Sequence, residues 1–142
     1  MSDVRITAGT FHFSARFEHE AAPRTCAAFE RLLPFTSQVI HVRWSGEAVW
    51  VPLGDLSLGL EAENATCYPH PGEILLYPGG LSETELLIGY GRTSFASKAG
   101  ALAGNHFLTM VSGLEQLPAL GRLVLWQGAQ PLVIEVGGQV LP

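Results

Sequence analysis

Charged residues, and lysine above all, are scarce in this chain of 142 residues. Asp, Glu, Lys and Arg make up 15% of it, against about 25% in an average protein, and Lys98 is the only lysine. The net charge is −5. A protein that binds a nucleic-acid backbone needs clustered cations, so we expect no nucleic-acid partner.

Long apolar runs and an N-terminal leader are also lacking. No stretch reaches the roughly 18 apolar residues that a membrane-spanning helix needs. Residues 1–5 hold no basic segment followed by an apolar run, which predicts no signal peptide and a cytoplasmic protein without membrane contact. Cysteine is limited to Cys26 and Cys67, which we expect to be structural thiols rather than a disulfide.

Glycine and proline, in contrast, are abundant. The 16 Gly and 9 Pro residues are spread along the chain rather than gathered in a linker, which indicates many short elements. The hydrophobic share of 47% excludes intrinsic disorder. We therefore predict a single folded domain over residues 1–142.

Two segments near the N-terminus show clear periodicity. Residues 11–18 alternate apolar and polar, which predicts a half-buried strand. The residues expected to face the core are Phe11, Phe13, Ala15 and Phe17. An amphipathic helix is predicted over residues 23–33, with Pro23 in its first turn and Pro34 ending it.

A β-hairpin is predicted over residues 38–51, with Ser45-Gly46 as its turn. A loop of two residues would place His41 opposite Trp50 and sort the side chains into two faces. The apolar face is predicted to hold Ile40, Val42, Val49 and Val51. The mixed face is predicted to hold His41, Arg43, Ala48 and Trp50.

Residues 52–72 show no sustained period. They are either a functional lid or binding loop, or they contain a further short strand. Beyond them, a short helix is predicted over residues 113–121. Further strands are predicted over residues 73–77, 84–90, 106–111, 123–126 and 131–136.

The order of these elements and several short motifs resemble the cyclophilins. Ala22–Phe29 is similar to their helix start, Ile40–Arg43 to their aromatic-His-Arg triplet, and Leu102–His106 to their Leu-x-Gly-x-His motif. Over Arg43–Trp50 and Pro71–Gly80 the chain resembles an uncharacterised bacterial family with the same barrel. The resemblance implies a mainly β, cyclophilin-like fold: a closed or nearly closed antiparallel barrel of about eight strands with two short helices.

The same resemblance makes a peptidyl-prolyl isomerase one alternative, although the chain departs from cyclophilins in their groove. Only Arg43 and His106 have counterparts, Ala101 stands where cyclophilins carry a tryptophan, and a Gln-Phe-Phe run is absent. Because most of the pocket for a prolyl ring is missing, the fold is transferred more safely than the activity.

Arg43, His41 and Trp50 form the strongest candidate site. An arginine fork supplies planar donors for a carboxylate or carbonyl, and an indole supplies a stacking wall. The alternative is a surface cation-π pair between Arg43 and Trp50.

Glu47, His106 and Tyr77 are further ligand-binding candidates, each with a plainer structural alternative. Glu47 could anchor Arg43 or act as a base, or be a solvated carboxylate beside the turn. His106 could carry a proton near neutral pH, or fill a core or edge position. Tyr77 could line the same cleft, or only end its strand.

No metal or cofactor site is predicted. Cys67 and His70 have the spacing of half a zinc site, but the other half is missing. Gly89–Ser94 begins like a dinucleotide fingerprint, yet Ser94 replaces its third glycine and no helical pattern follows.

These features predict a module that binds a small carboxylate- or amide-bearing ligand in a cleft, against Arg43, Trp50 and His106. The alternatives are the isomerase and a non-catalytic structural or partner subunit, and whether the chain catalyses a reaction stays open. The low charge content also predicts association into homo-oligomers.

Overall fold

The computed structural model describes residues 3–137; residues 1–2 and 138–142, at the two ends of the predicted domain, lie outside the described residues. The helices are α1 (Pro23–Glu30) and α2 (Leu117–Gln127), and a 3-10 turn spans Leu114–Gln116. The strands are β1 (Val4–Ala8), β2 (Phe11–Phe17), β3 (Phe35–His41), β4 (Gly46–Gly54), β5 (Ala65–Thr66), β6 (Glu73–Tyr77), β7 (Thr84–Thr93), β8 (Ala96–Ser97), β9 (Gly100–Ala101), β10 (Gly104–Ser112) and β11 (Gln130–Val136).

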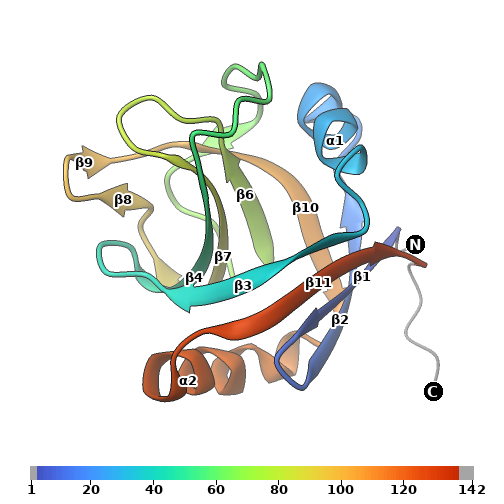
Figure 1. The fold of residues 1–142 in the computed structure, drawn as a ribbon, viewed down its shortest axis with the longest axis vertical. Helices are drawn as coiled ribbons and strands as arrows, with labels where there is room; N and C mark the ends of the chain where they lie inside the picture. The colour runs from blue at the N-terminus through green and yellow to red at the C-terminus, as the bar shows by residue number, and fades with distance from the viewer. Residues whose placement is uncertain (1–2, 138–142) are drawn as a thin grey trace.

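Eight antiparallel strands close into a barrel in the order β1-β11-β3-β4-β7-β6-β10-β2 (Figure 1). Strand β2 closes it by pairing with β1 on one side and with β10 on the other. The short β5 extends the sheet beside β10, and β8 and β9 form a separate hairpin. The prediction of a closed antiparallel barrel of about eight strands with two helices is confirmed.

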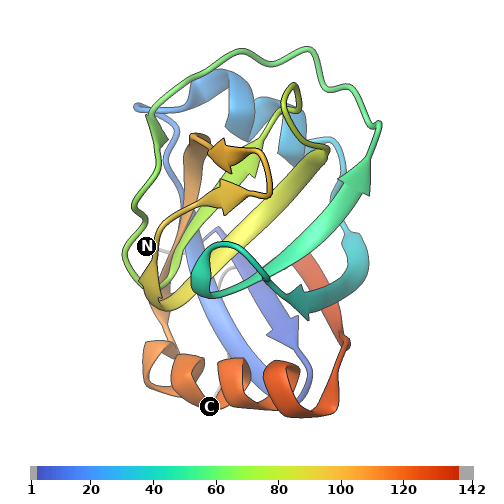
Figure 2. The ribbon, with the colours of Figure 1, turned by 90° about the vertical axis from the view of Figure 1, so that its left-hand side faces the viewer.

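Alternating side chains of the strands fill the barrel. In β2, Phe13, Ala15 and Phe17 are buried and Phe11 packs against the core, as its period predicted. The two helices lie at opposite ends of the barrel (Figures 1 and 2). Helix α1 inserts Phe29, which is fully buried and lies 5.1 Å, centroid to centroid, from the ring of Phe107. The helix ends at Glu30, earlier than the predicted range of 23–33.

The predictions for residues 113–126 were wrong in part, because a helix over Leu117–Gln127 replaces both the shorter helix over 113–121 and the strand over 123–126. Pro118 lies in the first turn, where its missing N–H breaks no helical bond. Gly121 lies inside the helix because the ring of Tyr90 occupies the space that a Cβ would take. Within residues 3–137 this helix is the longest, and none is long and apolar enough to cross a membrane.

The predicted register of the 38–51 hairpin was also wrong by one residue. Ile40 pairs with Trp50 and His41 with Val49. Residues 43–45 form a wider turn than two residues, since the hydroxyl of Ser45 is held by the backbone of Ala96. As a result Ile40 shares the outer face with Trp50, whereas His41 shares the inner side with Val49.

The 52–72 segment contains the two-residue strand β5 and is tied to the barrel. Asn105, fully buried on β10, accepts a hydrogen bond from the backbone N–H of Glu63 and donates one to the carbonyl of Glu61. The Glu63 carboxylate in turn accepts hydrogen bonds from the backbone N–H groups of Arg24 and Thr25 and from the Thr25 hydroxyl. Through these hydrogen bonds the 52–72 segment is anchored to the barrel and to α1, which makes it a fixed connection rather than a lid.

Glu63→Ala is expected to lower the free energy of unfolding by about 1–2 kcal/mol, because α1 has no side-chain cap of its own and Glu63 serves as one. Although partial desolvation opposes ionisation, the hydrogen bonds from Thr25 and Arg24 lower the pKa of Glu63, so this stabilisation should fade as the pH falls below the usual range of a glutamate. Urea denaturation at pH 7 measures the change. The exposed Glu61 provides the control, and equal losses in Glu61→Ala and Glu63→Ala would contradict the capping role.

A second apolar cluster lies outside the barrel and positions the site. It joins the outer faces of β4, β6 and β7 to the hairpin that follows β7. Phe95, before β8, packs edge-on against Tyr77 with 5.8 Å between ring centroids. The cluster consists of Ala48, Leu75, Tyr77, Leu87, Phe95 and Leu102, with Val42 and Trp50 at its margin.

Candidate functional site

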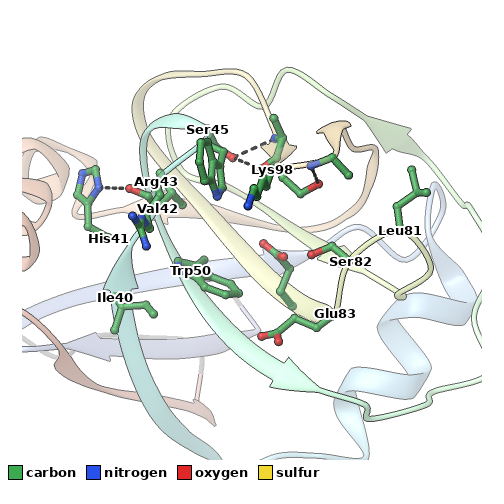
Figure 3. A pocket seen from close by; sticks show the side chains of 15 residues that line it. Ile40, His41, Val42, Arg43, Ser45, Trp50, Leu81, Ser82, Glu83 and Lys98 are labelled. Carbon is green, nitrogen blue, oxygen red and sulfur yellow. Dashed lines mark hydrogen bonds between the residues drawn. The ribbon is translucent and has the colours of Figure 1, made fainter.

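A recess of about 360 Å³ opens on the outer face of the barrel, beside this second cluster. Residues 40–45, at the end of β3 and in the following turn, form one wall, and residues 81–83, in the β6–β7 loop, form the opposite wall (Figure 3). Residues 96–99 of the β8–β9 hairpin complete the rim. Trp50 of β4 and Glu85 of β7 reach the recess from the barrel wall itself. This volume suits a small organic molecule.

Arg43 and Trp50 both line this recess, and the register that brings them there differs from the predicted one. Trp50 is half-buried, whereas Arg43 is exposed in the turn after β3. The guanidinium carbon of Arg43 lies 5.9 Å from the ring centroid of Trp44, which is 54% exposed at the rim. The cation-π partner is therefore Trp44 rather than Trp50, and the indole face of Trp50 is left to the recess.

The hairpin over the recess brings a second cation, Lys98, to its rim. The hairpin is held in place at Ala96 by Ser45. The Ser45 hydroxyl donates a hydrogen bond to the Ala96 carbonyl and accepts one from the Ala96 N–H, both at 3.0 Å. The hairpin is fastened further by the buried side chains of Phe95 and Leu102.

Two carboxyl groups, of Glu83 and Glu85, line the same recess. Glu85 is only 6% exposed, and burial, with a smaller contribution from the Glu83 carboxylate, raises its pKa to about 8. Glu85 is not among the site residues predicted from the sequence. Its position in the strand could have indicated it. Residues 85 and 87 of β7 share a face, and Leu87 pairs with Trp50, so Glu85 lies on the same face of the sheet as Trp50.

His41 borders the recess and is hydrogen-bonded to Tyr90 of the neighbouring strand β7. Its Nδ1 lies 2.8 Å from the carbonyl oxygen of Val42 and its Nε2 lies 2.8 Å from the Tyr90 hydroxyl. The carbonyl can only accept, so Nδ1 donates, and in the neutral ring Nε2 accepts from the tyrosine. Burial, and then the Glu47 carboxylate, raise the pKa of Tyr90, which keeps it a donor.

Glu47, His106 and Tyr77 do not line the recess. The Glu47 carboxylate accepts a hydrogen bond from the backbone N–H of Arg92 rather than from Arg43. Tyr77 is buried beneath Phe95, and its hydroxyl accepts the N–H of Leu81.

His106 belongs to a separate hydrogen-bonded chain on β10. Its Nε2 lies 2.7 Å from the Thr109 hydroxyl, which donates to the Glu18 carboxylate at 2.6 Å. A hydroxyl has one proton to give, so Nε2 of His106 is the donor to Thr109. Arg43 and His106, the pair that the cyclophilin resemblance connects, therefore do not meet in this recess.

The two cysteines are free thiols. Cys26 is fully buried, its Sγ lies 3.3 Å from the carbonyl of Phe107, and burial raises its pKa to about 12. Cys67 is half-buried in the connection before β6. Within residues 3–137, no group of three or more His, Cys, Asp or Glu side chains is placed to hold a metal ion.

Solved structures share this fold. The structure of McbB in complex with tryptophan matches with a TM-score of 0.73 and 17% sequence identity, over 98% of this chain and 46% of that one. The present chain thus spans about half the length of that neighbour. The solution structure of the hypothetical protein AF2241 from Archaeoglobus fulgidus matches with a TM-score of 0.60 and 18% identity, over 96% of this chain and 95% of that one. At these identities the likeness concerns the fold alone.

Two further comparisons concern families and curated proteins. No curated protein matches the chain. Residues 4–135 match the family described as "Protein of unknown function (DUF3830)".

Proposed function

This chain belongs to the DUF3830 family, whose function is unknown, and we propose that its outer recess binds a small carboxylate- or amide-bearing molecule. The guanidinium of Arg43 binds the planar oxygen-bearing group, and the indole of Trp50 packs against the apolar body of the ligand.

The observation that carries this proposal is an arginine without a protein acceptor beside an aromatic wall. Among residues 3–137, only Arg5 and Arg16 pair with a glutamate, and the other arginines, Arg43 included, make no ion pair and no guanidinium hydrogen bond. Of these unpaired arginines, Arg43 is the one that lines the recess. An arginine fork that is held near a recess but lacks an acceptor is suited to a carboxylate or an amide carbonyl from a ligand. Lys98 adds a second positive charge at the same rim.

The apolar part of the ligand follows from the rest of the lining. Ile40 and Trp50 offer apolar surface to the recess, and Leu81 is 74% exposed on the wall opposite Ile40. Such side chains lose contact with water when a hydrocarbon or aromatic body covers them, which contributes about 25 cal/mol per Å² of apolar area. Aromatic acids and amides are therefore the first compounds to test.

Binding is tested by titrating the protein with 3-phenylpropionate and with 3-phenylpropionamide. Arg43→Ala and Trp50→Phe should each weaken binding about tenfold or more, because the first removes the planar donors and the second replaces the indole wall by a smaller ring. Arg122→Ala and Trp126→Phe are the matched controls, since both residues are exposed on α2, outside the recess.

The proposal would be contradicted if Arg43→Ala, Trp50→Phe and the two controls all bound with equal affinity. It would also be contradicted if neither compound bound to the wild type. Five expectations from the sequence stay predictions. They are the cyclophilin-like character of the barrel, the isomerase alternative, a role as a partner subunit, the cytoplasmic location and association into homo-oligomers.

A further inference from the structure

We infer that the ligand of this recess also carries an amino group, so that the site recognises an aromatic or aliphatic amino acid rather than a simple acid. This inference rests on the proposed function, because it places the ligand carboxylate at Arg43. It assigns the second pole of the ligand to Glu85, with Glu83 beside it.

Glu85 is a carboxyl group that the fold buries without an internal partner. It is more than nine-tenths buried, lines the recess, and accepts no hydrogen bond or ion pair from residues 3–137. Its cross-strand neighbours are Pro52 on β4 and Tyr77 on β6, and the Tyr77 hydroxyl is already engaged by the N–H of Leu81. Within residues 3–137 no side-chain oxygen is cut off from both solvent and hydrogen-bond partners, so the Glu85 carboxyl keeps contact with solvent. A largely buried carboxyl that has no protein partner is available to a hydrogen-bond donor of a ligand that enters the recess.

Arg43 and Glu83 lie on opposite walls of the recess (Figure 3). The charged groups that share it with Glu85 are Glu83, Arg43 and Lys98, and His41 is the titratable group at its border. Among residues 3–137 Glu85 forms no ion pair with either cation, and burial, followed by the Glu83 carboxylate, raises its pKa. Figure 3 shows Trp50 between the wall that carries Arg43 and the loop that carries Glu83.

A molecule with a carboxylate and an ammonium group matches this arrangement. The ammonium group would donate to the carboxylates of Glu85 and Glu83, and the carboxylate would accept from Arg43. Glu85 is largely protonated in the free protein at pH 7. When Glu85 pairs with the ammonium group as a carboxylate, it releases its proton to the solvent, so the binding of one zwitterionic ligand releases one proton.

Three probes that differ only at their polar ends separate the poles: phenylalanine, 3-phenylpropionate and phenethylamine. Calorimetric titrations at pH 7 in phosphate and in Tris give both affinity and the number of protons exchanged. Phenylalanine is expected to bind about tenfold more tightly than either truncated probe, and to release close to one proton from wild type. In Glu85→Gln this proton release should vanish, and phenylalanine should lose its advantage over 3-phenylpropionate. Glu61→Gln, outside the recess, should behave as wild type.

The outcomes separate the two proposals. If 3-phenylpropionate binds as tightly as phenylalanine and neither probe releases a proton, the amino-acid inference is overturned while the acid-binding function stands. If phenethylamine bound as tightly as phenylalanine, the inference would likewise be overturned, since the contact between Arg43 and the ligand carboxylate would then add nothing to the affinity. If none of the three probes binds, both proposals fail. The wild-type proton count decides the question even if Glu85→Gln does not fold.

Discussion

Glu85→Gln should be more stable than the wild type at pH 8 by an amount of the order of 4 kcal/mol, and about equally stable at pH 4.5. The reason is the burial of Glu85 in the barrel wall, which raises its pKa from the ordinary value of 4.5 to about 8. Glutamine keeps the shape of the side chain and carries no charge at any pH. The difference between the two proteins therefore reports the cost of ionising Glu85.

The sign of this pH dependence follows from proton counting. Between pH 4.5 and 8 the folded protein keeps the Glu85 proton, whereas the unfolded chain has lost it. Stability then falls as the pH rises, by about 1.4 kcal/mol per pH unit. Below pH 4.5 both states are protonated and no penalty remains. The contribution of Glu85 is thus most favourable in acid and is lost as the pH rises through 8.

Urea denaturation at pH 4.5, 6, 7 and 8 measures this difference. Glu83→Gln is the matched variant: removing the neighbouring carboxylate should lower the pKa of Glu85, so that the decline in stability ends at a lower pH and its total is smaller than in the wild type, without being abolished. Parallel stability profiles for wild type and Glu85→Gln would show that Glu85 ionises freely, and would remove the physical basis for a proton-linked site.

Gly121→Ala should destabilise the protein by about 3 kcal/mol, although alanine is the better helix former by about 1 kcal/mol. A Cβ at residue 121 would fall within the ring of Tyr90, well inside van der Waals contact. The ring cannot move freely, because its hydroxyl donates to His41. The steric overlap therefore outweighs the gain in helix propensity.

A double-mutant cycle checks this explanation. In a Tyr90→Ala background the ring is absent, so Gly121→Ala should be neutral or stabilising by up to about 1 kcal/mol in urea denaturation. If Gly121→Ala costs the same free energy with and without the Tyr90 ring, the packing of α2 against β7 is not what keeps glycine at this position.

The sequence was most informative where one local period dominates. The faultless alternation of residues 11–17 predicted β2 and its buried face, and the closed barrel followed from the resemblance and the count of strands. In contrast, Leu123–Trp126 has the apolar character of a strand, and Gly121 is typical of a helix end. Leu117, Leu120 and Val124 recur at the spacing of a buried helix face, and Gly121 lies inside this helix, where it packs against Tyr90, a residue distant in sequence.

The candidate site was predictable only in part for a similar reason. Arg43 and Trp50 could be placed together because they lie on one hairpin, within a few residues of each other. Glu85 and Lys98 join them through the pairing of β4 with β7 and through the hairpin after β7, contacts that a single sequence does not specify. His106 was predicted to join the site, yet its nearest polar partner, Thr109, lies on its own strand.

The three tryptophans provide the most direct test of the recess. Their indole N–H signals can be followed separately by ¹H–¹⁵N NMR during a titration with 3-phenylpropionate. Trp50 and Trp44 line the recess, whereas Trp126 is 77% exposed on α2 and lies outside it. We predict that the Trp50 signal, and with it that of Trp44, shifts with saturation while that of Trp126 stays in place. A titration that shifts Trp126 alone, or leaves all three signals unchanged, would contradict the assignment of this recess as the binding site.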